Sequence, residues 1–185
     1  MYMKKTIFGA LVGGLLIFIW QTLSWTMLDL HRPGENYTAK QDSIISFLSS
    51  QFSEDGAYMV PYIPKGSSSE EMEKEMKDAY GKPWAQIQYH AKMEYSMPMN
   101  IIRGLLVDII ITWMLCCMIM IYNNNNFSKT FISCLFVGFI SFLNIVYTKD
   151  IWYKVFDINA YLIDTVAAWG LCGLWLGWWL NRRKS

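Results

Sequence analysis

The sequence predicts an all-α membrane protein: four transmembrane helices with a small α+β extracytoplasmic insertion between helices 1 and 2. Four separate apolar runs each have about the 20 residues that a helix needs to cross the hydrocarbon core of a bilayer. Charged residues make up only 17% of the 185 residues and hydrophobic residues 54%, whereas soluble domains are about 25% charged. The net charge of +1 gives no indication of a nucleic-acid partner.

The first apolar run covers residues 7–28 and follows Lys4 and Lys5. A secretory signal peptide begins in the same way, but its apolar stretch has about 7–15 residues and is followed by a small-residue cleavage site. This run is longer and has no such site, so we expect an uncleaved anchor, helix 1, within residues 1–28. The other three helices are expected within residues 99–185, at 101–122, 127–147 and 158–180.

The charge distribution predicts how the chain is threaded, because lysine and arginine near the ends of spans favour the cytoplasmic side. With the N-terminus inside, the inner segments contain basic residues and no acidic ones: Lys4, Lys5, Lys129, Arg182, Arg183 and Lys184. The segment 29–98 has seven basic and eleven acidic residues. We therefore predict a multi-pass protein of the bacterial inner membrane, with both termini cytoplasmic and residues 29–98 outside. Trp20 and Trp25 lie near the expected outer interface, where tryptophan commonly forms an aromatic belt.

The outer segment 29–98 contains patterns typical of two helices and two strands. Thr38 followed by Gln41 predicts a capping box at the start of the first helix. A group of serines and acids predicts the start of the second helix, and a glycine its end: Ser67, Ser68, Glu70, Glu71 and Gly81. Strands are expected at residues 57–63 and 86–95, the latter from its alternation of apolar and polar side chains.

Polar residues within the spans form one layer in the outer half of the predicted bundle, and each is costly to bury in a membrane. The layer is expected to contain side chains from every helix: Gln21, Arg103, Asp108, Asn144 and Asp164. His31 lies at the mouth of helix 1, above this layer. In one interpretation Arg103 pairs with Asp164 or Asp108 and holds the helices in register. In the other, the layer is a pocket in which one aspartate binds a cation, a proton or a polar ligand.

Two pairs of glycines have the spacing of close helix contacts in membranes. Gly9 and Gly13 lie on helix 1, and Gly173 and Gly177 lie on helix 4, in the inner half of each. We expect helices 1 and 4 to meet there, which would leave the outer half splayed around the polar layer. The alternative is that one of the two pairs forms the seam of a homodimer.

The sequence gives no indication of a metal site, a cofactor or a catalytic residue. Four cysteines lie in the predicted spans: Cys116, Cys117, Cys134 and Cys172. None lies in the outer segment, which indicates packing residues rather than disulfides. The two histidines, His31 and His90, lie outside the spans, whereas haem within the bundle needs a ligand from a span. No nucleophile elbow, phosphate loop or metal-binding helix motif occurs.

Two segments resemble spans of a known group of proteins. Residues 9–20 read Gly-Ala-Leu-Val-Gly-Gly-Leu-Leu-Ile-Phe-Ile-Trp, and residues 161–170 read Tyr-Leu-Ile-Asp-Thr-Val-Ala-Ala-Trp-Gly. They look like the first and last spans of small four-helix bacterial inner-membrane proteins that have no known activity. The resemblance implies the four-helix architecture and the bacterial inner membrane. The long outer segment departs from it, because shorter loops are expected in that group.

The leading functional hypothesis is a non-enzymatic accessory subunit or assembly factor that binds another protein through residues 29–98. The lack of catalytic motifs and the presence of a patterned insertion favour it, since insertions of this kind often carry function. The expected partner is a membrane protein or a second copy of the chain, with membrane lipid around the helices. The alternative is a small transporter or ligand-binding protein that works through Asp108 and Asp164. An enzyme is the least favoured class.

Overall fold

The computed structural model describes residues 2–121 and 126–182. Within them, four helices are long and apolar enough to cross a membrane: Met3–Thr26, Met97–Ile121, Phe127–Trp152 and Ile158–Asn181. The prediction of four such helices is confirmed. The expected end of helix 2, at residue 122, lies outside the described residues.

The third span is longer than predicted and is not a uniform α-helix. It consists of α5 (Phe127–Ser141), the π-helical segment η2 (Phe142–Tyr147) and α6 (Thr148–Trp152). Across η2, the Thr148 hydroxyl donates a hydrogen bond to the Leu143 carbonyl five residues earlier, at 2.9 Å. π-Helical turns are rare and occur frequently at functional sites. A functional site in the bundle is therefore expected to lie beside this segment.

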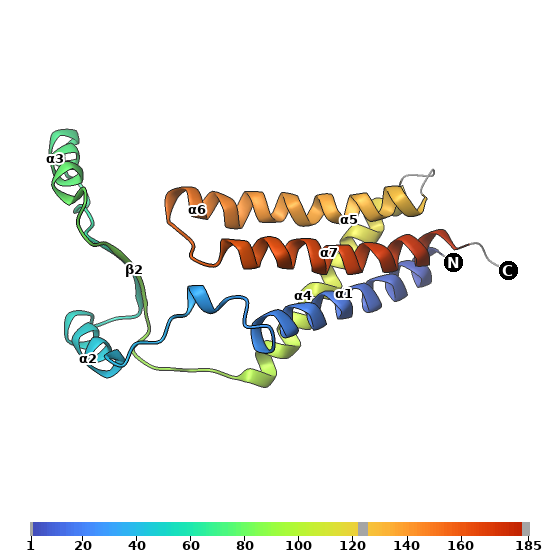
Figure 1. Cartoon of the computed structure of the whole chain (residues 1–185), viewed down its shortest axis with the longest axis horizontal. Coiled ribbons are helices and arrows are strands. Elements are labelled where there is room, and N and C mark those ends of the chain that lie inside the picture. The colour runs from blue at the N-terminus through green and yellow to red at the C-terminus, as the bar shows by residue number, and fades with distance from the viewer. Residues whose placement is uncertain (1, 122–125, 183–185) are drawn as a thin grey trace. The chain divides into compact units, whose positions relative to one another are not determined.

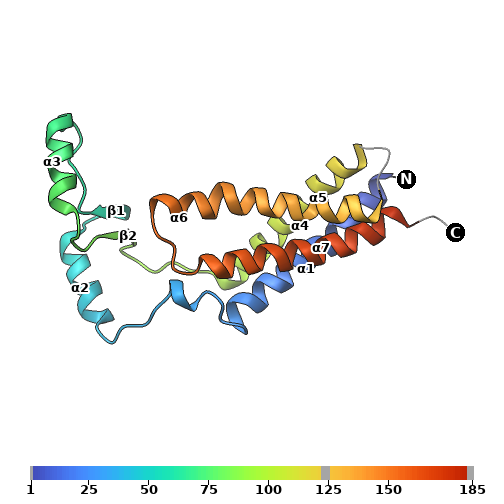
Figure 2. The same ribbon diagram turned by 45° about the horizontal axis from the view of Figure 1, so that its top comes forward.

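The spans are arranged in the order α4, α1, α7 and α5 (Figures 1 and 2). α1 (Tyr2–Thr26) packs between α4 (Met97–Ile121) and α7 (Ile158–Asn181). α7 also packs against α5, whereas α4 and α5 contact each other little. α1 begins and α7 ends at the same end of the bundle. We call the opposite end, where α1 ends and α4 and α7 begin, the loop end.

The glycine pairs contribute to three different helix contacts. On α1, a Cβ atom at Gly9 would meet a side chain of α7 at 3.1 Å, whereas one at Gly13 would meet Thr112 of α4 at 2.8 Å and Cys172 of α7 at 3.2 Å. On α7, a Cβ atom at Gly173 or Gly177 would meet side chains of α5 at 3.0 Å and 2.9 Å. The expected packing of α1 on α7 is formed, but the two pairs do not face each other. The reason is that α7 has two neighbours and its glycines lie on the side of α5.

The core of the bundle is apolar and contains three of the cysteines. Cys116, Cys134 and Cys172 are completely buried among residues such as Ile17 and Leu176. All four cysteines are free thiols. Cys116, Cys134 and Cys172 are thus packing residues of the core, whereas Cys117 is half-buried.

Residues 37–95 form a second compact unit. Its elements are α2 (Gln41–Gln51), β1 (Gly56–Val60), α3 (Ser69–Ala79) and β2 (Ala85–Tyr89). The two strands pair antiparallel, with Tyr58 opposite Ile87. The ring of Phe52, which follows α2, stacks on Tyr58 with 3.9 Å between ring centroids. The expected mixture of helices and a small sheet is thus present in this unit.

The two predicted capping boxes have different outcomes. α2 begins after Lys40, which makes no side-chain cap, and the Thr38 hydroxyl accepts a hydrogen bond from Lys40 N–H instead of from Gln41. In α3 the predicted box is formed: the Ser68 hydroxyl accepts from Glu71 N–H, and the Glu71 carboxylate accepts from Ser68 N–H at 2.8 Å. The backbone bond, and then the hydroxyl bond, hold the pKa of Glu71 below its ordinary value of 4.5.

Candidate functional site

His31 lies in a turn that folds back from the end of α1 onto the start of α7. α1 ends at Thr26, and Leu30 N–H donates a hydrogen bond to the Ser24 carbonyl at 3.1 Å. Asp29 in this turn has a φ of 51°, a conformation that Asp adopts more readily than most residues. The turn buries the His31 side chain, which is 2% exposed.

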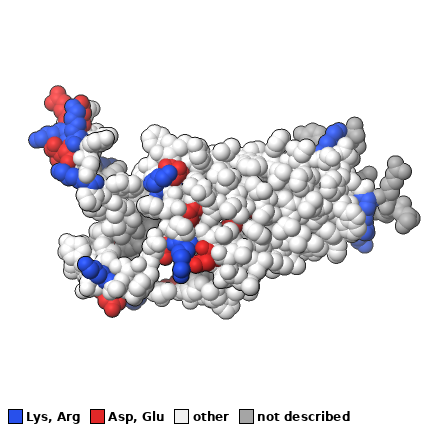
Figure 3. All heavy atoms as spheres, viewed as in Figure 1, with Lys and Arg blue, Asp and Glu red and all other residues white. Residues whose placement is uncertain are grey.

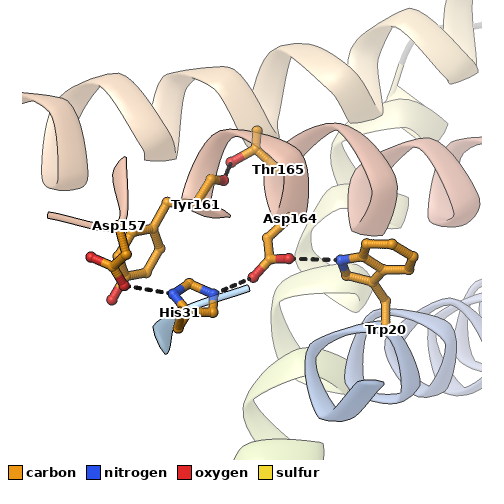
Figure 4. A network of polar contacts seen from close by, with 6 residues as sticks. All are labelled: Trp20, His31, Asp157, Tyr161, Asp164 and Thr165. Carbon is orange, nitrogen blue, oxygen red and sulfur yellow. Dashed lines mark hydrogen bonds and ion pairs between the residues drawn. The ribbon is translucent and has the colours of Figure 1, made fainter. Parts of the chain in front are cut away.

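Both ring nitrogens of His31 contact carboxylates from α7 or its N-cap (Figure 4). Nδ1 lies 2.7 Å from Asp157 Oδ2, and Nε2 lies 2.9 Å from Asp164 Oδ2. The second oxygen of Asp164 accepts a hydrogen bond from Trp20 Nε1 on α1, also at 2.9 Å. One histidine therefore ties the segment after α1 to two points on α7, and Trp20 adds a third connection.

Aromatic rings enclose the His31 ring. Trp25 of α1 stacks on it, with 3.9 Å between ring centroids and an interplanar angle of 5°. Tyr161 of α7 meets it edge-on at 4.7 Å. Gly34 covers the neighbouring carboxyl group, since a Cβ atom there would lie 3.0 Å from Asp157 Cγ. These contacts leave little room for water around the ring.

The geometry fits a protonated His31 ring. An imidazolium donates from both nitrogens, whereas a neutral imidazole donates from one only, and ionised carboxylates only accept. The protonated ring with both carboxylates ionised has a net charge of −1. Buried charges are costly unless they are paired and hydrogen-bonded, and here each nitrogen of the ring has a carboxylate partner. Asp157 also lies at the N-terminus of α7, where the helix dipole favours a negative charge.

The sequence contains a signal for this site that the hydropathy of the spans does not reveal. Asp157, Tyr161 and Asp164 have the i, i+4, i+7 spacing that places side chains on one face of a helix. Asp157 was overlooked because it precedes the fourth apolar run. Trp20 and Trp25 were interpreted only as an aromatic belt, yet one donates to Asp164 and the other stacks on His31.

Asp108 belongs to a separate contact, between α4 and α1. Its side chain is 4% exposed and shares a hydrogen bond with Gln21. Its Oδ2 atom has no hydrogen-bond partner within the described part of the chain. The backbone around Asp108 packs directly on Gly14 of α1. Gln21, a member of the predicted polar layer, thus partners Asp108.

Arg103 and Asn144 do not join the polar cluster. Both side chains are exposed on the surface of the bundle. Among residues 2–121 and 126–182, Arg103 forms no ion pair with either aspartate, so the pairing expected from the sequence is not formed. The reason is that the partner of Asp164 is His31, which reaches it from the turn after α1.

A cavity of about 700 Å³ lies between the four spans. Its volume is within the range of small-molecule sites. α1 and α7 form its floor, and α4 and the α5–η2 helix form its two sides. Most of its lining is apolar, and its polar lining residues include Gln21, Thr22, Thr26, Asn100, Ser141, Asp164 and Thr165. Gln21 and Asp164 are thus the sequence-predicted residues that line it. His31 supports the cavity wall through Asp164.

Among the described residues, no cluster of three or more His, Cys, Asp or Glu side chains has a geometry that would hold a metal ion. Comparisons of the chain with models of known protein families, with curated proteins and with solved structures find no match.

Proposed function

We propose that this chain is a small ligand-binding membrane protein that holds its ligand in the cavity between the four spans. The observation that carries the proposal is one cavity of about 700 Å³ lined by all four spans and by the Asp164 side chain. An ionisable residue inside a span is costly and marks a functional site by default. Trp20 and His31 hold both oxygens of Asp164 in place, as a binding group requires.

The π-helical segment supports the same proposal. Phe142, Ile145 and Val146 of η2 line one side of the cavity. A π-helical turn has an extra residue, which weakens the regular ladder and redirects side chains. A weakened hydrogen-bond ladder is expected where the redirected side chains shape a site.

Two isoleucines of the third span offer a matched test. Ile140 and Ile145 are both 65% exposed, but only Ile145 lines the cavity. We expect native mass spectrometry of the gently extracted protein to show a bound small molecule, which Ile145→Trp removes because the indole fills the cavity mouth. Ile140→Trp should retain it. A protein without added mass, or equal added mass in both variants, would argue against a ligand site here.

We also propose the bacterial inner membrane as the location, with both termini cytoplasmic. On the visible face in Figure 3, the middle of the bundle carries no charged side chain, and the end with the two termini shows only Lys and Arg. This asymmetry follows the positive-inside rule. A C-terminal green fluorescent protein fusion should therefore fluoresce in bacteria, and an alkaline phosphatase fusion at the same site should be inactive. The opposite result would reverse the orientation and place the loop end in the cytoplasm.

A second candidate function is partner binding through residues 37–95, as an accessory subunit or assembly factor. Large side chains of this unit are largely exposed: Phe47, Tyr62, Tyr80 and Met93. Exposed apolar groups outside the spans are typical of interaction sites. The gentle extraction described above also tests it. A protein present at fixed stoichiometry that is lost when Tyr62 and Tyr80 are replaced by serine would support this role, and its retention would count against it.

A further inference from the structure

The cavity between the four spans has a polar end and an apolar end. Thr22 lies near the end of α1, Asn100 in the first turn of α4, and Asp164 near the beginning of α7, so these residues line it toward the loop end. Farther along the same helices, the lining consists of apolar residues such as Ile17 and Ala168. This gradient matches a ligand that has a polar head and an apolar chain.

The polar end of the cavity offers several hydrogen-bond acceptors, beside the amides of Gln21 and Asn100, which can donate or accept. The Thr22 hydroxyl donates to the Phe18 carbonyl at 2.9 Å, and the Thr165 hydroxyl donates to the Tyr161 carbonyl at 2.8 Å. Both hydroxyl groups therefore use their proton within the helix and present lone pairs. An ionised Asp164 also only accepts. A head group that donates hydrogen bonds is complementary to this lining.

The charge near the cavity is negative. Among the described residues that line it, none is Lys or Arg. With both carboxylates ionised, the cluster of His31, Asp157 and Asp164 has a charge of −1 when the ring is protonated and −2 when it is neutral. The electrostatic field at the polar end therefore favours a cation in either state of the ring.

Aromatic rings add a second attraction for a cation. Trp25, Tyr161 and Trp169 all line the cavity, close in sequence to its polar residues. The faces of such rings attract ammonium groups, although His31 already covers one face of Trp25. An anionic head group would lose this attraction and would face the Asp164 carboxylate.

The cavity is accessible from the side of the bundle. α4 and α5 contact each other little, and the lining residues Met97, Ile101 and Ile145 are exposed. In a chain that spans a membrane, such exposed apolar side chains face lipid. An amphiphile dissolved in the bilayer can therefore enter between α4 and η2 without crossing water.

We propose that the ligand is a cationic amphiphile with an ammonium head group, bound with its head near Asp164 and its chain among the apolar residues deeper in the bundle. The proposal rests on the ligand-binding function above and names the class of ligand. It requires that the charge of the head group, and not only the length of the chain, determines the affinity.

Three probes with the same alkyl chain test this requirement: tetradecylammonium, tetradecanoate and tetradecanol. Binding is measured by equilibrium dialysis against the full-length protein in dodecyl maltoside, with protein-free micelles as the background. Site-specific binding is the part that Ile145→Trp removes and Ile140→Trp retains. We expect the ammonium probe to bind at least about tenfold more tightly than tetradecanoate. Asp164→Asn should weaken the ammonium probe by at least about tenfold and leave tetradecanol within about twofold.

The outcomes separate the two proposals. If tetradecanoate binds as tightly as the ammonium probe, or if a folded Asp164→Asn protein keeps full ammonium binding, the cationic class is wrong while the cavity remains a ligand site. If none of the probes shows binding sensitive to Ile145→Trp, the proposed ligand-binding function fails as well. The comparison of head groups uses the unaltered protein, so it decides the question even if Asp164→Asn does not fold.

Discussion

Replacing His31 by alanine is expected to lower the free energy of unfolding by about 3–5 kcal/mol, because two buried carboxylates lose their shared partner. The side chains of Asp157 and Asp164 are 8% and 14% exposed, so water can replace little of the hydrogen bonding that the two carboxylates lose. His90→Ala is the matched control. His90 is 70% exposed and lies 3.5 Å from Asp55, and exposed ion pairs contribute only about 0–1 kcal/mol.

The measurement is the unfolding transition of each variant in a neutral detergent, followed by tryptophan fluorescence or circular dichroism. Adding Asp164→Asn to His31→Ala should recover part of the lost stability, because one of the two facing charges is removed. This interaction appears as a coupling energy in the double-mutant cycle. A His31→Ala protein as stable as His90→Ala, or an additive double variant, would show that the network does not hold the turn after α1 on α7.

The four spans could be predicted from the sequence because their length and composition are local properties. The structure differs from the prediction where the ends of an element depend on contacts with another part of the chain. β2 ends at Tyr89 rather than at residue 95 because its partner strand begins at Gly56, directly opposite Tyr89. Beyond that residue the alternating pattern continues, but within the described parts of the chain no strand lies opposite it. α2 begins without the predicted Thr38 box because Thr38 bonds to the nearer Lys40 N–H.

The site was predicted only in part, for a physical reason. The depth of Asp164 in its span marks it as a polar residue that needs a partner, but depth is a property of one helix and does not identify that partner. Its partner comes from the turn after α1, which is set by a positive φ at Asp29 and by the hydrogen bond from Leu30 to Ser24. Neither feature produces periodicity. Arg103, the partner expected from the sequence, lies on an exposed face of α4.

Replacing Gly14 by alanine is expected to be the most damaging of the glycine substitutions, because the new methyl group would meet backbone. A Cβ atom there would lie 2.7 Å from both Cα and N of Ile109, so the clash is relieved only if α1 and α4 move apart. Overpacking of this kind costs about 1–3 kcal/mol or more. The separation would also disturb the buried contact of Asp108 with Gln21, which lines the cavity.

Gly170 provides the matched control on α7, because a Cβ atom there would have nothing within 4 Å. Gly170→Ala should leave stability unchanged or raise it by up to about 1 kcal/mol, since alanine is the better helix former. The two variants are compared by unfolding in neutral detergent and by their binding of the alkylammonium probe. If Gly14→Ala matches Gly170→Ala in both, then the close approach of α1 and α4 is not required, and the cavity does not depend on it. If Gly14→Ala alone loses stability and binding together, the contact between α1 and α4 sets the width of the site.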